Sequence, residues 1–422
     1  MNFCLGLLLA LIGLASVASA ADRPRVIVSS DIGGTDPDDY QSMAHLFVYA
    51  DALDLEGLIA SPYGPGRKRH VLEVIDAYEQ DYANLRTHAA LYPAPSHLRA
   101  ITKQGALDAL DDPGFGDPTE GSEWIVRCAR RADPRPLWVL VWGGIDDLAQ
   151  ALHDAPDILP KLRVYFIGGP NKKWSAHAYN YIERHHPAIW MIEANSTYSG
   201  FFAGGNQGGD LGNSSFVAAH VAGRGALGRY LAKWRDGEMK MGDTPSVYFV
   251  LGKNPEDPAQ PNWGGSFVRA WERPRAVFNR LTTTADRVEQ YAIVDIELPP
   301  GHGVNHSHRA HLAIENQMIA GFVDARGNLR FRFSPKAAKS WTYTLHSDVA
   351  GLDGKTGGLT SFLAPSDAAQ RPSARTPNWW TDNPAPELAQ GSQQGARTIS
   401  RWREEYLRDF AARIARGQAP KP

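Results

Sequence analysis

Short apolar segments alternate with amphipathic ones between Arg25 and Ala222, and this alternation restricts the possible folds more than any other feature of the sequence. The apolar segments are rich in β-branched and aromatic residues and are bounded by Gly, Pro or Asp, as buried parallel strands are. They cover residues 25–30, 55–61, 137–142, 163–168 and 188–193. Such alternation predicts an α/β fold with a doubly wound, mostly parallel sheet, in which ligands bind beyond the carboxyl ends of the strands.

The pattern changes after about residue 275. Strict alternation at 329–333 and 341–345 predicts a small antiparallel β-domain of the sandwich type. Residues 364–386 are rich in Pro, Ser and Asn, which indicates an irregular crossing segment. A final helix is predicted from apolar residues spaced three or four apart, at Ile399, Trp402, Tyr406, Phe410 and Ile414. We therefore predict an α/β domain over 21–275, a β-domain over 276–363, and a segment over 364–422 whose helix docks on the α/β domain.

The first residues form an apolar run that ends in Ala18-Ser19-Ala20. Such a run predicts a signal peptide over residues 1–20, cleaved after Ala20, and hence a secreted or periplasmic protein without a membrane anchor. Cys128 is then the only cysteine of the mature chain, which excludes an intramolecular disulfide. The net charge of −2 offers no basic surface, so nucleic acid is not expected as a partner.

Four carboxylates follow the first predicted strand directly, at Asp31, Asp36, Asp38 and Asp39. Like charges this close repel one another unless a cation neutralises them. Carboxylate oxygens suit Ca²⁺, which takes six to eight oxygen ligands. In the other interpretation, one Asp caps the next helix and its neighbours are solvated. Four carboxylates at the end of one strand favour the cation.

The segment DIGGTDPDD at residues 31–39 resembles the D-x-D-P-G-x-D-D loop of the nucleoside hydrolases. It is more similar to the loop of nucleoside-hydrolase-like proteins described as cellulose-binding. Those proteins also carry a β-domain and an NWWTD segment, which is present here at residues 378–382. The resemblance covers essentially the whole mature chain and implies a nucleoside-hydrolase-like fold with bound Ca²⁺.

The resemblance also implies roles for the residues of this loop. It makes Asp39 a calcium ligand and Asp38 a contact to sugar hydroxyls. The spacing departs from the parent motif, so both Asp31 and Asp36 are candidates for the general base. Asp31 is also a candidate metal ligand.

Later motifs match the same family. The backbone carbonyl of Asp146 and the carboxylate of Asp243 are implied as further calcium ligands, and Glu193 and Asn195 as contacts to sugar hydroxyls. Without the resemblance, a helix cap is the preferred interpretation of Asp146 and a surface loop that of Asp243. Gly242 stands where the parent enzymes carry a His that helps to protonate the departing base.

Aromatic and histidine residues offer weaker signals. Trp142 and Trp263 are candidates for stacking on a base or sugar ring, although most tryptophans belong to cores. His177 is a candidate replacement for the missing acid. The remaining histidines of interest lack a regular ligand spacing and are expected to be solvated, at His302, His306, His308 and His311.

These motifs predict a secreted, calcium-dependent hydrolase of N-glycosidic bonds that acts on a small riboside or related glycoside. Three alternatives stay open: hydrolysis of an O-glycoside, non-catalytic binding of cellulose or another cell-wall polysaccharide, and a calcium site that only stabilises the fold. The sequence does not identify the sugar, its aglycone, the leaving-group acid or the oligomeric state.

Overall fold

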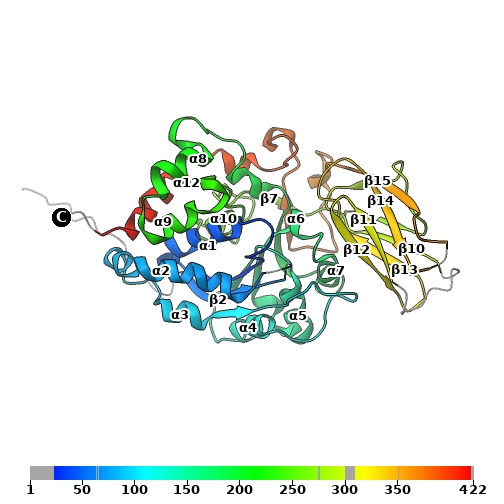
Figure 1. The fold of residues 1–422 in the computed structure, drawn as a ribbon, viewed down its shortest axis with the longest axis horizontal. Helices are drawn as coiled ribbons and strands as arrows, with labels where there is room; N and C mark the ends of the chain where they lie inside the picture. Colours follow the sequence, from blue (N-terminus) through cyan, green and yellow to red (C-terminus); the bar gives the residue numbers. More distant parts are fainter. Residues whose placement is uncertain are drawn as a thin grey trace, which may run out of the picture.

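The computed structural model describes residues 23–62, 64, 66–273, 276–299, 309–349 and 351–419. The predicted signal peptide lies outside the described residues, as do His302, His306 and His308. The described strands form two sheets of eight, which Figure 1 shows as two bodies beside each other. This arrangement confirms the predicted α/β fold with an added β-domain.

The first sheet is almost entirely parallel. Its described strands run parallel to their neighbours except β7, which is antiparallel to β16. In spatial order the strands are β3 (Thr102–Gln104), β2 (Asp54–Ala60), β1 (Arg25–Ser30), β4 (Leu137–Val141), β5 (Leu162–Ile167), β6 (Trp190–Ala194), β16 (Trp379–Asp382) and β7 (Phe267–Arg269). The five strands predicted from sequence therefore occur within one or two residues of their expected positions.

Helices cover both faces of this sheet. Alternate side chains of β1 enter two separate cores, Val26 and Val28 on one face and Ile27 on the other. The first core includes α1 (Asp38–Val48), α2 (Lys68–His88), α3 (Pro95–Ala100), α9 (Gly225–Ala232), α10 (Thr244–Val250) and α12 (Arg403–Ile414). The second includes α4 (Glu120–Ala129), α5 (Asp146–Asp154) and α7 (Ala176–His185). Among the described helices, none is long and apolar enough to cross a membrane.

The second sheet is mainly antiparallel and folds over on itself. In chain order its strands are β8 (Ala276–Phe278), β9 (Arg287–Glu289), β10 (Val294–Leu298), β11 (Ala310–Ile314), β12 (Gln317–Val323), β13 (Leu329–Phe333), β14 (Ser340–Ser347) and β15 (Thr356–Phe362). The first half of β12 pairs with β11 and its second half with β13. Because β12 changes partner, the two halves of the sheet enclose one core that contains Phe331 and Leu345.

The chain returns from the β-domain to complete the first sheet. The segment expected to be irregular contains β16, which inserts between β6 and β7. The predicted final helix is interrupted, forming α11 (Arg397–Ser400) and α12. In Figure 1, α12 lies in red beside α8 (Asn213–Phe216) and α9 in green. Its buried face comprises Tyr406, Leu407, Phe410 and Ile414.

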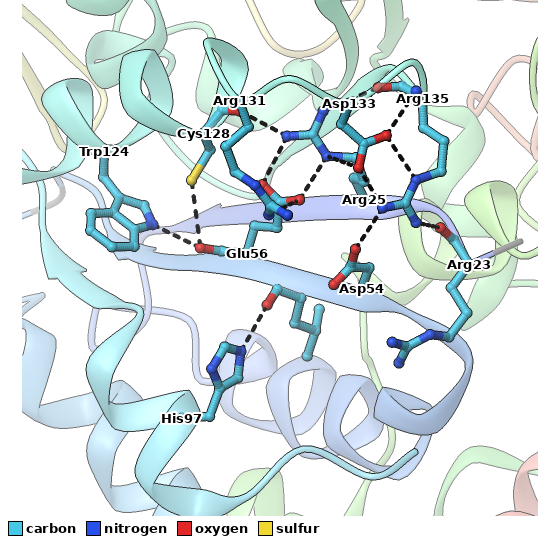
Figure 2. Close-up of polar contacts among 11 residues, drawn as sticks. Arg23, Arg25, Asp54, Glu56, His97, Trp124, Cys128, Arg131, Asp133 and Arg135 are labelled. Atoms are coloured by element: carbon cyan, nitrogen blue, oxygen red, sulfur yellow. Dashed lines mark hydrogen bonds and ion pairs between the residues drawn. The ribbon is translucent and has the colours of Figure 1, made fainter. Parts of the chain in front are cut away.

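The amino ends of the first strands are held by ion pairs (Figure 2). Arg25, 1% exposed, contacts both carboxylate oxygens of Glu56, at 2.6 and 3.0 Å. Arg135 joins Asp54 and Asp133 at 2.9 and 2.7 Å. Burial raises the pKa of Cys128 to about 12, so this thiol is inert at neutral pH. These ion pairs therefore give the amino end of the sheet a structural role, and we expect ligands to bind at the carboxyl end.

Removal of residues 364–422 should destabilise the α/β domain, because it takes away β16, which joins the edge strand β7 to the sheet, and α12, which packs in the core. A single-residue form of this prediction is Phe410→Ala, which should lower the free energy of unfolding by about 3–5 kcal/mol. Glu405, exposed on the same helix, provides the control, since Glu405→Ala should change it by less than about 0.5 kcal/mol. Chemical denaturation measures both; equal stability of the truncated and full-length chains would contradict the docking.

Candidate functional site

The loop after β1 turns tightly and delivers its aspartates to one place. Gly33 has a φ of +93°, and a Cβ there would lie 1.9 Å from the His70 ring, so only glycine fits. The turn is closed by the Gly34 amide, which donates to the Asp31 carbonyl at 2.9 Å. Helix α1 then begins with Asp38 and Asp39 in its first turn.

Asp243 joins this loop from a distant part of the chain, at the start of α10. One carboxylate oxygen each from Asp38, Asp39 and Asp243 lie within 4.8 Å of one another. These three residues are 7%, 4% and 4% exposed. With Asp31 and Asp36 they line a cavity of about 250 Å³, called the carboxylate cavity below.

The electrostatics of this cavity are those that a bound cation would relieve. Burial and the neighbouring carboxylates raise the pKa of Asp39 and of Asp243 well above the usual range. Burial also raises the pKa of Asp31 to about 7. Oδ2 of Asp243 is buried without a hydrogen-bond partner. An orphaned carboxylate oxygen among other hard oxygens fits a Ca²⁺ ion well.

The two candidate bases have different surroundings. Asp36 forms ion pairs with Lys240 and, at 3.3 Å, with Arg235. Although burial opposes it, the Lys240 ammonium lowers the pKa of Asp36. Asp31, by contrast, faces other carboxylates. Cations therefore balance the charge of Asp36 at the rim of the cavity, whereas, in the described part of the chain, no ion pair reaches Asp31 inside it.

Two glycines permit close approaches at this site. A Cβ on Gly143, directly after β4, would lie 2.6 Å from the Cβ of Asp31. A Cβ on Gly242, which stands where the parent enzymes carry a His, would lie 2.6 Å from Oδ2 of Asp38, so a side chain there would require the Asp38 carboxylate to shift. The Gly242 amide instead donates to Asp38 at 3.3 Å.

Trp142 and Asp146 occupy different positions. Trp142 lines the carboxylate cavity and is held by its Nε1, which donates to Ser246 Oγ at 2.7 Å. Asp146 is the first residue of α5 and is not among the residues lining the cavity. Its carboxylate turns away to accept from the Leu110 amide at 2.8 Å. A calcium contact through the Asp146 carbonyl stays a prediction.

Glu193 does not reach the carboxylate cavity, contrary to its expected sugar contact. Its two carboxylate oxygens are taken by Lys172 and, at 2.7 Å, by Arg273. Lys172 also donates to the Tyr291 carbonyl at 3.0 Å, and Arg273 contacts Glu289 at 3.2 Å. Glu193 is thus the centre of a buried ion-pair network between β6 and the β-domain.

Asn195 lies just past β6 and is also outside the cavity lining. Its Oδ1 is buried without a partner, and its Nδ2 makes one long contact of 3.4 Å to Thr381. Its expected sugar contact stays a prediction.

Trp263 belongs to a different cavity, so it cannot stack on a ligand held by the carboxylates. This second cavity, of about 610 Å³, lies at the carboxyl end of α10 and is also lined by Tyr248 and Trp402. Asp243 begins the same helix, which is roughly 10 Å long at 1.5 Å per residue. Trp263 is close in sequence to the motif that contains Asp243, but the sequence does not show that Trp263 lies at the opposite end of α10 from Asp243.

Several residues of the cavity were missed by sequence reasoning. They are Tyr198, Lys173, Lys240 and Lys336. Lys240 stands three residues before Asp243, so a search for cations beside the metal motif would have found it. Lys336 belongs to the β-domain, and nothing in its local sequence indicates the cavity.

His177, the candidate acid, is also elsewhere. It lies 3.1 Å from Arg332 Nη1 and 3.7 Å from Asp112, at the contact between α7 and β13. His311 lies on β11 and stacks on His346. Neither histidine lines the carboxylate cavity.

The chain was compared with known proteins. A comparison with curated proteins finds no match. A solved nucleoside hydrolase-related hypothetical protein from Saccharophagus degradans, associated with carbohydrate metabolism, is 21% identical and aligns with a TM-score of 0.51. The alignment covers 81% of this chain and 100% of that one, and it supports the fold.

Two nucleoside hydrolases align more weakly. The inosine-uridine preferring enzyme from Bacillus anthracis is 14% identical with a TM-score of 0.36, over 59% of this chain and 86% of its own. The purine-preferring enzyme from Gardnerella vaginalis is 11% identical with a TM-score of 0.42, over 93% and 99%. The family model described as "Cellulose-binding Sde182, nucleoside hydrolase-like domain" matches residues 25–267, more than half of the sequence, and the chain therefore belongs to this family.

Proposed function

We propose that this protein is a secreted, calcium-dependent hydrolase of N-glycosidic bonds with a small riboside or related glycoside as substrate. The observation that carries the proposal is the buried trio of Asp38, Asp39 and Asp243, with the orphaned Oδ2 of Asp243, beside a cavity at the carboxyl ends of the strands. Because these carboxylates line a cavity, a ligand could reach an ion that they hold.

The carboxylates of Asp39 and Asp243, with Asp31, would hold the Ca²⁺ ion. When bound, the ion supplies positive charge that fixes a water and two sugar hydroxyls in attack geometry. Asp31 would accept the water proton, and Asp38 would accept a hydrogen bond from a sugar hydroxyl. The remaining carboxylates stabilise the positive charge that develops on the sugar ring, as in glycosidases generally.

Non-catalytic carbohydrate binding is the second candidate, since the family description names cellulose binding. The second cavity, with Trp263 and Trp402, provides aromatic faces on which sugar rings stack. Hydrolysis of an O-glycoside would use the same carboxylates. Release of free sugar separates both hydrolase functions from binding alone.

Calcium should bind one site per chain and stabilise the fold. At a free concentration of 100 times Kd, a ligand of the native state contributes about 2.7 kcal/mol. Asp243→Asn should abolish this stabilisation, whereas Asp108→Asn, an equal charge change at an exposed position, should preserve it. Metal analysis and thermal unfolding after chelation measure the effect. Absence of calcium together with a Tm indifferent to chelator would refute the site.

The stabilisation by calcium should increase with pH. The pKa of Asp31 is raised by burial to about 7 in the folded protein, against about 3.9 in an unfolded chain. The metal-free native state therefore binds more protons, and it loses stability as the pH rises between these values. Calcium binds the deprotonated carboxylates and offsets that loss. We expect a larger calcium-induced rise in Tm at about pH 7.5 than at about pH 5; an equal or smaller rise would contradict the assignment.

Asp31→Asn should lower kcat on an activated riboside by about 10²–10⁴-fold if Asp31 is the base. Asp36→Asn should lower it by less than about tenfold, since Lys240 and Arg235 neutralise this carboxylate. The calcium content of each variant distinguishes loss of the base from loss of the metal. A larger effect at Asp36 would reverse the assignment.

A poor leaving group should react slowly, because Gly242 stands where the parent enzymes carry the His that helps to protonate the leaving group. General acid catalysis contributes about 10²–10⁴-fold, and a nitrophenyl riboside needs no proton. We expect kcat/KM to be clearly higher for nitrophenyl riboside than for inosine or uridine. His177→Ala should change none of these values. Efficient hydrolysis of inosine would show that another group supplies the proton, and turnover of no riboside would favour the polysaccharide functions.

A further inference from the structure

The β-domain contributes a lysine to the carboxylate cavity. Lys336 lies in the loop between β13 and β14, and it meets Lys173, which lies between the short helix α6 (Gly168–Asn171) and α7. Both lysines also line a smaller hollow between the two bodies, with Trp341 on the β-domain side. The two ammonium groups thus stand together at the rim of a cavity whose base is acidic.

This lysine pair differs from the other lysines around it, because Glu315, which lines the same hollow, forms its ion pair with Lys339. Lys172 pairs with Glu193, Lys240 with Asp36 and Asp38, and Lys339 with Glu315. No ion pair joins Lys173 or Lys336 to a carboxylate among the described residues. Burial, together with the Lys336 charge, lowers the pKa of Lys173 to about 8, and Glu315 offsets this only in part.

Two adjacent cations are costly unless an anion joins them, and an oxyanion would receive hydrogen bonds from both. The cavity of about 250 Å³ is small for a ligand site, and the carboxylates and both lysines line it, so a small ligand held there would meet both kinds of group. A neutral riboside or a cellulose chain would leave both lysines unpaired.

We propose that the substrate bound in the carboxylate cavity carries an anionic group, a phosphate or a carboxylate, which Lys173 and Lys336 bind while the sugar hydroxyls face the calcium site. This inference rests on the proposed function and refines its substrate class. It also gives the β-domain a part in substrate selection, since Lys336 belongs to that domain.

The test is an NMR titration of the full-length, calcium-loaded protein with two pairs of probes. Ribose is compared with ribose 5-phosphate, and glucose with glucuronate, so that the pairs distinguish a phosphate from a carboxylate. The anionic member of at least one pair should bind about tenfold to a hundredfold more tightly at low salt.

The variants then assign this preference to the lysines. Lys173→Met with Lys336→Met should abolish the preference and leave the affinity for the neutral sugar unchanged. Lys336→Met alone should reduce the preference for the anionic sugar. Because Lys336 is exposed, this single variant should fold even if the double variant does not. Lys355→Met, an equal charge change at an exposed position of the β-domain that lines neither the carboxylate cavity nor the smaller hollow, should retain the full preference.

Each other outcome has a defined meaning. Equal binding of neutral and anionic sugars by the native protein overturns the inference and leaves the proposed function standing. A preference that survives in the variants of Lys173 and Lys336, or that disappears in Lys355→Met as well, also overturns it. Binding of no sugar at all removes the proposed function and the inference together.

Discussion

Burial of carboxylates without enough cations is the constraint around which this molecule is arranged. Lys240 compensates Asp36 and Asp38, but no ion pair of the described residues reaches Asp39 or Asp243. Two helix N-termini, those of α1 and α10, point at the cluster and provide part of the missing positive charge through their dipoles. The remainder has to come from a bound cation or from protons. The same fold that makes the site reactive therefore makes its stability depend on what occupies it.

A second electrostatic feature, the ion-pair network around Glu193, connects the first sheet to the β-domain. Glu193 is fully buried, and its partners Lys172 and Arg273 extend toward Tyr291 and Glu289 at the start of the β-domain. A buried ion pair of this kind is weak support for stability but a strong support for geometry, because few other arrangements satisfy all its charges. We infer that the network fixes the β-domain in the orientation that brings Lys336 to the carboxylate cavity. The network therefore contributes more to the orientation of the β-domain than to the free energy of unfolding.

Local patterns in the sequence predicted the parts of the molecule that depend on local residues. The apolar strands, the loop with Asp31, Asp38 and Asp39, and the apolar face ending at Ile414 all follow from residues close together in the chain. Glu193 and Trp263 failed as cavity residues because distant segments decide their surroundings: Arg273 takes the Glu193 carboxylate, and α10 carries Trp263 away from the cavity. Lys336 was not predictable for the same reason. A sequence motif gives the position of a residue in the chain, but the residue's surroundings in the fold depend on partners from distant segments.

The insertion of β16 between β6 and β7 has a consequence for how the chain acquires its fold. The loop that carries Asp31, Asp38 and Asp39 lies near the start of the sequence, yet β7 has no described neighbour in the sheet until residues 379–382 have been made. About a hundred residues, mostly of the β-domain, separate β7 from β16 in the sequence. The pairing of these two strands therefore closes a long loop, which costs entropy and slows its formation. During synthesis the apolar edge of β6 stays uncovered until the end of the chain arrives. The order of synthesis thus delays completion of the first sheet, and an unpaired strand edge of this kind is prone to wrong pairing while it stays exposed.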